Sequence, residues 1–113
     1  MNPLPEGPNF KILLVEDNEA DVYMLRRALQ TAGLSFDLTV IDNGADALRF
    51  VRTLSVTQRP DIAVLDLNLP RNSGIEVLAA LRATRHLAQI PVAVVTSSPS
   101  PEERGRAEAL RVS

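Results

Sequence analysis

Three carboxylates follow directly after two short apolar runs of the sequence. Glu16 and Asp17 come after the run at 11–15, and Asp66 comes after the run at 62–65. If the two runs form neighbouring parallel strands, these residues meet at the carboxyl edge of the sheet, where open α/β folds place their sites. Three carboxylates held together repel one another, so a proton or a cation must relieve the repulsion.

The chemistry open to such a cluster is that of a hard divalent cation and a phosphoryl group. Mg²⁺ takes oxygen ligands, and in proteins it commonly binds a few carboxylates together with waters and phosphate oxygens. An aspartate beside the cation, such as Asp66, can attack a phosphoryl group and form an aspartyl phosphate. Thr96 and Ser97 end a further apolar run and bring hydroxyl groups to the same edge. The cluster is therefore a candidate site for Mg²⁺ and for phosphoryl transfer.

The strands that must position these residues are visible as apolar runs. The run at 62–66 is nearly unbroken, as is typical of a strand buried on both faces of a parallel sheet. The runs at 11–15 and 90–96 are also continuous. By contrast, 36–41 alternates apolar and polar residues, which fits a sheet edge with one face open to solvent.

Helices are predicted between and after these strands. Asn18 can cap the first helix, and Gly33 is well placed to end it. The last helix begins with a strong start signal but has a thin apolar face, so it should be the least stable. The alternation of strands and helices predicts an α/β fold with a doubly wound parallel sheet. The predicted helices cover 18–33, 47–54, 73–85 and 100–110.

The composition indicates one soluble domain. With 113 residues, 45% of them hydrophobic, the chain is long enough for a single core. The net charge of −2 argues against nucleic acid or an acidic membrane as the ligand, and the absence of cysteine excludes disulfides and thiolate sites. The single histidine, His86, excludes a multi-histidine metal site. We expect a flexible, proline-rich leader at 1–10 and one domain at 11–113. No apolar run reaches the roughly 20 residues of a membrane helix, so a cytoplasmic location is expected.

At the positions described above, the sequence resembles the receiver domains of two-component response regulators. The resemblance covers residues 11–110 and is greatest for the small single-domain receivers that partner phytochrome-type and similar histidine kinases. Each motif is weak by itself, but the motifs stand at matching strand ends in the right order. The matching positions are the acidic pair Glu16-Asp17, the phosphoacceptor Asp66, the loop residues Asn68, Pro70 and Gly74, and the switch hydroxyl Thr96.

The resemblance implies a flavodoxin-like (CheY-like) fold and a phosphorylation switch. A histidine kinase, or a small phosphodonor, would pass a phosphoryl group to Asp66 in a Mg²⁺-dependent reaction. Thr96 would then turn inward to the phosphoryl group, while Asn68 and Ser98 would tune how quickly water removes it. The protein would catalyse only its own phosphorylation and dephosphorylation and would not otherwise be an enzyme. The implied metal ligands are Glu16, Asp17, Asp66 and the backbone carbonyl of Asn68.

The sequence departs from the family pattern at its end. The family has a fifth strand ending in lysine and proline, followed by a fifth helix, and both are missing from the chain, which stops at Ser113. The only lysine, Lys11, starts the first strand and is expected at the opposite edge of the sheet. Either the chain is a truncated version, or the protein lacks part of its switch. An uncovered fourth strand invites pairing, so we expect a homodimer through this strand and the last helix.

Two other functions remain open. A docking or dimerisation module would keep the fold without phosphorylation, and the missing lysine favours it. A Mg²⁺-dependent hydrolase would use an aspartyl phosphate. Against the hydrolase, Asn68 stands where such phosphatases carry a second acid, and the sequence has no glycine-rich phosphate loop. Single residues also fit structural roles, since Asp66 could cap a turn and Thr96 could satisfy backbone groups.

Overall fold

The computed structural model of the chain describes residues 9–67, 69 and 74–95. In these ranges strands and helices alternate in the predicted order. The strands are β1 (Phe10–Val15), β2 (Phe36–Ile41), β3 (Ile62–Leu65) and β4 (Val92–Val94), and the helices are α1 (Glu19–Thr31), α2 (Gly44–Thr53) and α3 (Gly74–Ala83). Two short 3₁₀ turns, η1 (Val56–Gln58) and η2 (Arg85–Leu87), precede β3 and β4. None of the described helices combines the length and the apolar character that crossing a membrane requires.

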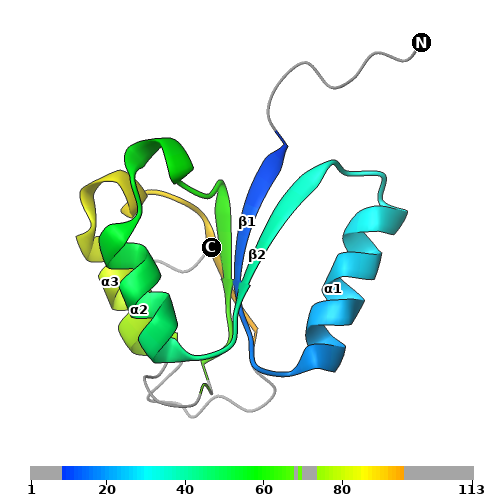
Figure 1. The fold of residues 1–113 in the computed structure, drawn as a ribbon, viewed down its shortest axis with the longest axis horizontal. Helices are drawn as coiled ribbons and strands as arrows, with labels where there is room; N and C mark the ends of the chain where they lie inside the picture. Colours follow the sequence, from blue (N-terminus) through cyan, green and yellow to red (C-terminus); the bar gives the residue numbers. More distant parts are fainter. Residues whose placement is uncertain (1–8, 68, 70–73, 96–113) are drawn as a thin grey trace.

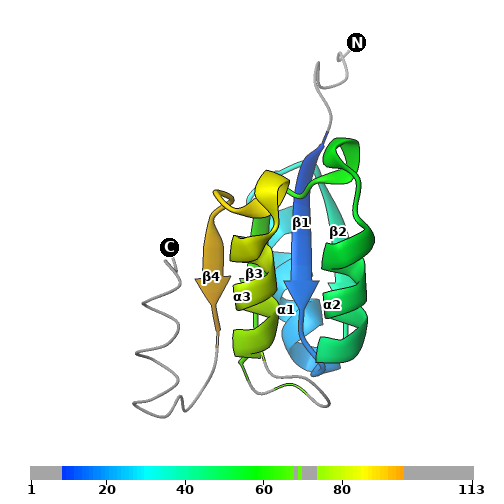
Figure 2. The same cartoon turned by 90° about the vertical axis from the view of Figure 1, so that its left-hand side faces the viewer.

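The four strands form one parallel sheet in the order β2-β1-β3-β4. Helix α1 covers one face of this sheet, and α2 and α3 cover the other (Figure 1). The view turned by 90° shows α2 and α3 in front of the strands and α1 behind them (Figure 2). The predicted α/β fold with a doubly wound parallel sheet is therefore confirmed. Strand β2 lies at an edge, as its alternating sequence indicated.

The observed strand boundaries differ slightly from the predicted ones. Strand β1 begins at Phe10, inside the predicted leader, and β4 covers only 92–94 of the predicted 90–96. The N–H of Ile90 donates to Leu87 in the preceding turn, and Pro91 has no N–H to donate, so the strand starts after them. The end of the predicted strand at Thr96 and the predicted last helix at 100–110 lie outside the described residues.

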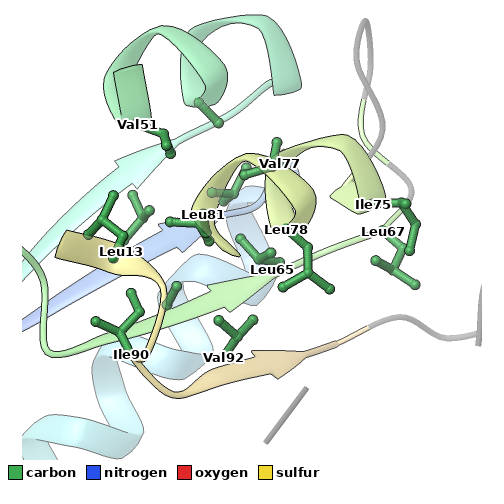
Figure 3. Packing of buried hydrophobic residues seen from close by; sticks show 14 residues of the cluster. Leu13, Val51, Leu65, Leu67, Ile75, Val77, Leu78, Leu81, Ile90 and Val92 are labelled. Carbon is green, nitrogen blue, oxygen red and sulfur yellow. The ribbon is translucent and has the colours of Figure 1, made fainter. Parts of the chain in front are cut away.

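The face of the sheet toward α2 and α3 holds the hydrophobic core (Figure 3). Alternate residues of adjacent strands share this face, since the register sets Leu13 beside Ala63 and Ala63 beside Val92. Side chains of α2, α3 and η2 fill the space above them, and every member of the cluster is at most 5% exposed. The members are Leu13, Val15, Ala47, Val51, Ala63, Leu65, Leu67, Ile75, Val77, Leu78, Leu81, Leu87, Ile90 and Val92.

The face of the sheet toward α1 is packed less completely. Ile62 and Val64 of β3 are only half-buried, and α1 contains no buried residue. Helix α1 packs chiefly against β2, so a cleft of about 580 Å³ remains beside Leu14, Val64 and Met24. The prediction that β3 is buried on both faces is therefore wrong for the face toward α1.

The start and the end of α1 follow the predicted signals. The Oδ1 of Asn18 accepts hydrogen bonds from the backbone N–H groups of Ala20 at 2.9 Å and Asp21 at 3.3 Å. After the helix, Gly33 adopts a φ of 76° and its N–H donates to the carbonyl of Gln30. This left-handed conformation is the reason for glycine at the end of the helix.

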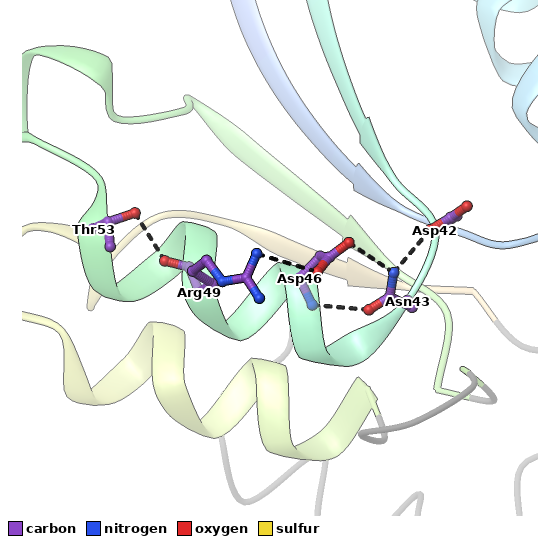
Figure 4. Close-up of polar contacts among 5 residues, drawn as sticks. All are labelled: Asp42, Asn43, Asp46, Arg49 and Thr53. Carbon is purple, nitrogen blue, oxygen red and sulfur yellow. Dashed lines mark hydrogen bonds and ion pairs between the residues drawn. The ribbon is translucent and has the colours of Figure 1, made fainter.

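A second asparagine, Asn43, caps α2 and is buried (Figure 4). Its Oδ1 accepts from the N–H of Asp46 at 2.8 Å, while its Nδ2 donates to carboxylate oxygens of Asp42 at 2.9 Å and Asp46 at 3.0 Å. Farther along the helix, Arg49 forms an ion pair with Asp46 at 3.6 Å, and the hydroxyl of Thr53 donates to the Arg49 carbonyl. Helix α2 therefore begins at Gly44, earlier than the predicted 47, because Asn43 caps it directly after β2.

Candidate functional site

The backbone ladder sets Glu16 and Asp66 side by side. Glu16 follows β1, and its N–H donates to the carbonyl of Ile41 at 2.9 Å. Asp66 follows β3, and its N–H donates to the carbonyl of Val15 at 3.0 Å. Because β1 and β3 are adjacent parallel strands, both residues stand at the carboxyl edge of the sheet. The sequence pattern predicted this arrangement.

The three predicted carboxylates converge at this edge. One oxygen each of Glu16, Asp17 and Asp66 lies within 4.8 Å of the other two. Glu16 is only 6% exposed, Asp66 is half-buried and Asp17 is exposed. The cluster is therefore buried at Glu16 and open to solvent at Asp17. Carboxylate oxygens at this spacing are the donor set of a hard divalent cation, and the residues present therefore fit such an ion.

The cluster holds Glu16 in an unfavourable electrostatic environment. Burial raises the pKa of its carboxyl above the ordinary value, and the nearby charges of Asp66, Asp21 and Asp17 raise the pKa further. The backbone N–H of Asn18 donates to Oε2 of Glu16 at 3.1 Å and acts in the opposite direction. A cation bound at the cluster would supply the compensating charge that burial and like charges demand.

The cluster opens onto the cleft beside α1. Asn18 and Asp21 line the cleft together with the three carboxylates, and its floor is apolar, with Leu14 and Val64 from the strands and Val95 after β4. The N–H of Val95 donates to the carbonyl of Leu65 at 2.8 Å, which places Val95 at the same sheet edge as Asp66. The site is therefore an acidic patch at one end of an apolar cleft.

The single lysine lies where the sequence placed it, far along the sheet from the carboxylates. The Nζ of Lys11 donates to the carbonyl of Thr57 at 3.2 Å, and its N–H donates to Asp61, both at the amino-terminal end of the strands. Five of the predicted site and loop residues lie outside the described residues: Asn68, Pro70, Thr96, Ser97 and Ser98.

Two contacts of the site were missed by sequence reasoning. Asn18 was predicted as a helix cap, but its backbone N–H also holds Glu16. Gly74 was assigned only to a loop, whereas it lies directly against the backbone of Asp66 and its N–H donates to Leu67 at 3.2 Å. The Asn18 contact uses a main-chain N–H, which nearly every residue type carries, so the residue pattern gave no sign of it. The glycine at position 74 was the one signal in the sequence for the close approach to Asp66.

The chain matches the response regulator receiver domain family over residues 12–112. It is 37% identical over 95 residues to the response regulator Rcp1 of Synechocystis sp., covering 81% of this chain and 65% of that protein. It is also 37% identical over 100 residues to the probable methanogenesis regulatory protein FilR2 of Methanothrix harundinacea, covering 87% of this chain and 64% of that protein. The chain thus spans slightly less than two thirds of the length of these two relatives.

Solved structures of similar chains share the fold. The phosphorylated cyanobacterial phytochrome response regulator RcpA superimposes with a TM-score of 0.82 at 33% identity, over 93% of this chain and 77% of that one. The Mn²⁺-bound form of response regulator Rcp1 gives a TM-score of 0.81 at 34% identity, with the same coverage. The bacteriophytochrome response regulator RtBRR gives 0.76 at 33% identity, over 93% of this chain and 66% of that one.

Proposed function

This chain belongs to the response regulator receiver domain family, and we propose that it is a phosphorylation-controlled switch with Asp66 as its phosphoacceptor. The observation that carries the proposal is the convergence of the Glu16, Asp17 and Asp66 carboxylates within 4.8 Å. An isolated aspartate at a strand end would fit many roles. An aspartate half-buried beside two further acids at the carboxyl edge of a parallel sheet fits a metal-assisted phosphoacceptor far better.

We propose that the cluster binds Mg²⁺ in the working protein. Glu16, Asp17 and Asp66 would hold the ion, together with the backbone carbonyl of Asn68. When bound, Mg²⁺ supplies positive charge that offsets both the carboxylates and the oxygens of an incoming phosphoryl group. The relative Rcp1 has a Mn²⁺-bound form, which supports a divalent ion as a ligand of this chain, and the raised pKa of Glu16 supports a need for one at the cluster.

The transfer step proceeds on Asp66. A carboxylate oxygen of Asp66 attacks the phosphorus of a phosphohistidine on the partner kinase, so that a P–O bond forms and the P–N bond breaks. The histidine nitrogen keeps the electron pair of the broken bond and takes a proton from solvent. Thr96, the residue after Val95, then donates its hydroxyl to a phosphoryl oxygen. In this scheme the chain catalyses only its own phosphorylation and the hydrolysis that reverses it.

The partners proposed for the switch are a histidine kinase and a second copy of the chain. The similarity to RcpA and to RtBRR, named as phytochrome and bacteriophytochrome response regulators, supports a kinase of that class and hence a cytoplasmic location. Among the described strands β4 lies at a sheet edge, and Val95 beyond it is 52% exposed. We propose that this edge, with the segment predicted as the last helix, forms the dimer contact.

Acetyl phosphate provides the test of the phosphoacceptor. The protein is incubated with acetyl phosphate and Mg²⁺, and its intact mass is measured over time. We expect one phosphoryl group to be added, the addition to require Mg²⁺, and Asp66→Asn to abolish it. Asp37→Asn serves as the control, because Asp37 is an exposed aspartate near the amino-terminal end of β2, at the opposite edge of the sheet from Asp66. An unmodified wild-type protein would refute the switch and leave the docking module, and turnover of phosphoesters would indicate a hydrolase.

A further inference from the structure

Gly74, the first residue of α3, lies against the peptide that follows Asp66. A β-carbon built on Gly74 would overlap the carbonyl oxygen of Asp66 and would lie 2.7 Å from Cα of Leu67 and 3.0 Å from the carbonyl carbon of Asp66. β-Carbons essentially never approach other heavy atoms more closely than 3.0 Å. Of the described glycines, Gly33 has a positive φ and Gly74 does not, so Gly74 is needed here for its missing side chain and not for its backbone freedom.

Neither side of this contact can move freely. The strand side is fixed because the N–H of Asp66 donates to Val15, and the N–H of Val95 donates to the carbonyl of Leu65. The helix side is fixed because Ile75, Val77 and Leu78 of α3 are at most 3% exposed in the core. Close-packed interiors transmit strain instead of absorbing it. A side chain at position 74 must therefore displace either the Asp66 peptide or the first turn of α3.

We propose that Gly74 is a positioning residue for Asp66. The missing side chain lets α3 start directly against the Asp66 peptide, and this contact fixes where the Asp66 carboxylate stands relative to Glu16 and Asp17. The cluster spans only 4.8 Å, so a displacement of the Asp66 backbone by a few tenths of an ångström changes the spacing of the ligand oxygens. The consequences for metal and phosphoryl binding rest on the function proposed above; the displacement of the backbone does not.

The test compares Gly74→Ala with Val77→Ala. Both substitutions lie in α3. Val77→Ala removes atoms from the core and adds none against the Asp66 peptide, so it controls for lost stability. The backbone amide shifts of residues 16, 17 and 66 are recorded by NMR, and Mg²⁺ affinity is measured by titration at a temperature where both variants are folded. We expect Gly74→Ala to move these amide shifts and to weaken Mg²⁺ binding about tenfold, as is typical for loss of a residue that orients a ligand. Val77→Ala should leave both unchanged.

Equal amide shifts and equal Mg²⁺ affinity in the two variants would overturn the proposal. If Gly74→Ala folds poorly, the same measurements are made on both variants in trimethylamine N-oxide, which strengthens folding without contacting the site. Phosphorylation separates the two proposals: a wild-type protein that binds Mg²⁺ but gains no phosphoryl group refutes the switch. The Gly74 inference is then still decided by the amide shifts and the affinity.

Discussion

The two faces of the sheet are built from the same strands but are packed very differently. On the face toward α2 and α3, the residues of the two central strands, β1 and β3, are at most 1% exposed: Leu13, Val15, Ala63 and Leu65. On the face toward α1, the row that pairs Leu14 with Val64 borders a cleft of about 580 Å³. Helix α1 contributes no buried residue, whereas α3 contributes Val77 and Leu78 at 0% exposure among its buried positions.

This difference separates the part of the molecule that holds the strands from the part that forms the candidate site. The well-packed face fixes the relative position of β1 and β3, and through them the backbone of Glu16 and Asp66. Their carboxylates open toward the cleft on the other face, where atoms are less crowded. A site that must hold a fixed geometry and still admit a ligand needs a well-packed backbone that carries accessible side chains.

The largest expected effect is a difference between two leucines that both face the sheet. Leu78→Ala in α3 should lower the free energy of unfolding by about 3–4 kcal/mol, since the side chain is 0% exposed. Leu25→Ala in α1 should cost only about 1–2 kcal/mol, because Leu25 is half-buried beside the cleft. Urea unfolding of the two variants measures both losses. Equal losses would show that the α1 face is as well packed as the core.

A smaller effect is expected from the two helix caps. Asn43→Ala removes a buried side chain with three hydrogen bonds at the start of α2 and should cost about 2 kcal/mol. Asn18→Ala removes an exposed cap of α1 and should cost about 1 kcal/mol. Thermal unfolding followed by circular dichroism gives the ranking. A greater loss of stability in Asn18→Ala would reverse the expected ranking and show that the cap of α1 contributes more to stability than the cap of α2.

Much of the fold was predictable from the sequence because it depends on local patterns. Continuous apolar runs predicted the strands, Asn18 and Gly33 marked the ends of α1, and the alternation at 36–41 identified an edge strand. The convergence of acids was also predictable, since parallel strands bring their carboxyl ends together. These inferences need only the direction and order of the elements, and both follow from α/β topology.

The remaining features depend on how elements pack, which a single sequence does not encode locally. The run at 62–66 predicted burial on both faces, but the position of α1 near β2 leaves Ile62 and Val64 half-buried. Met24 of α1 lies at the cleft and is 66% exposed, although it is a large apolar residue. The close approach of Gly74 to Asp66 is likewise a contact between elements, visible only once α3 is seated.

The smallest expected effect concerns Glu16, which lines the cleft on the face toward α1 although it is buried. Since its pKa is raised in the folded protein, the folded state binds a proton more tightly than the unfolded state does. Without metal, the contribution of Glu16 to stability is therefore most favourable below the ordinary pKa of 4.5 and is lost as pH rises through the raised value. Glu16→Gln should remove this pH dependence while its amide oxygen still accepts from Asn18.

At pH 7 without metal, Glu16→Gln should therefore be slightly more stable than the wild type, by less than about 1 kcal/mol. Mg²⁺ at roughly ten times its dissociation constant should reverse the order, because it stabilises the wild type by about 1.4 kcal/mol and the variant by less. Urea unfolding with and without Mg²⁺ measures both effects, and Glu19→Gln, an exposed acid in the first turn of α1, is the control. A variant that is less stable than the wild type without metal would mean that the buried carboxylate already has a compensating partner within the protein. The acids at the cleft on the face toward α1 would then not depend on a cation for stability.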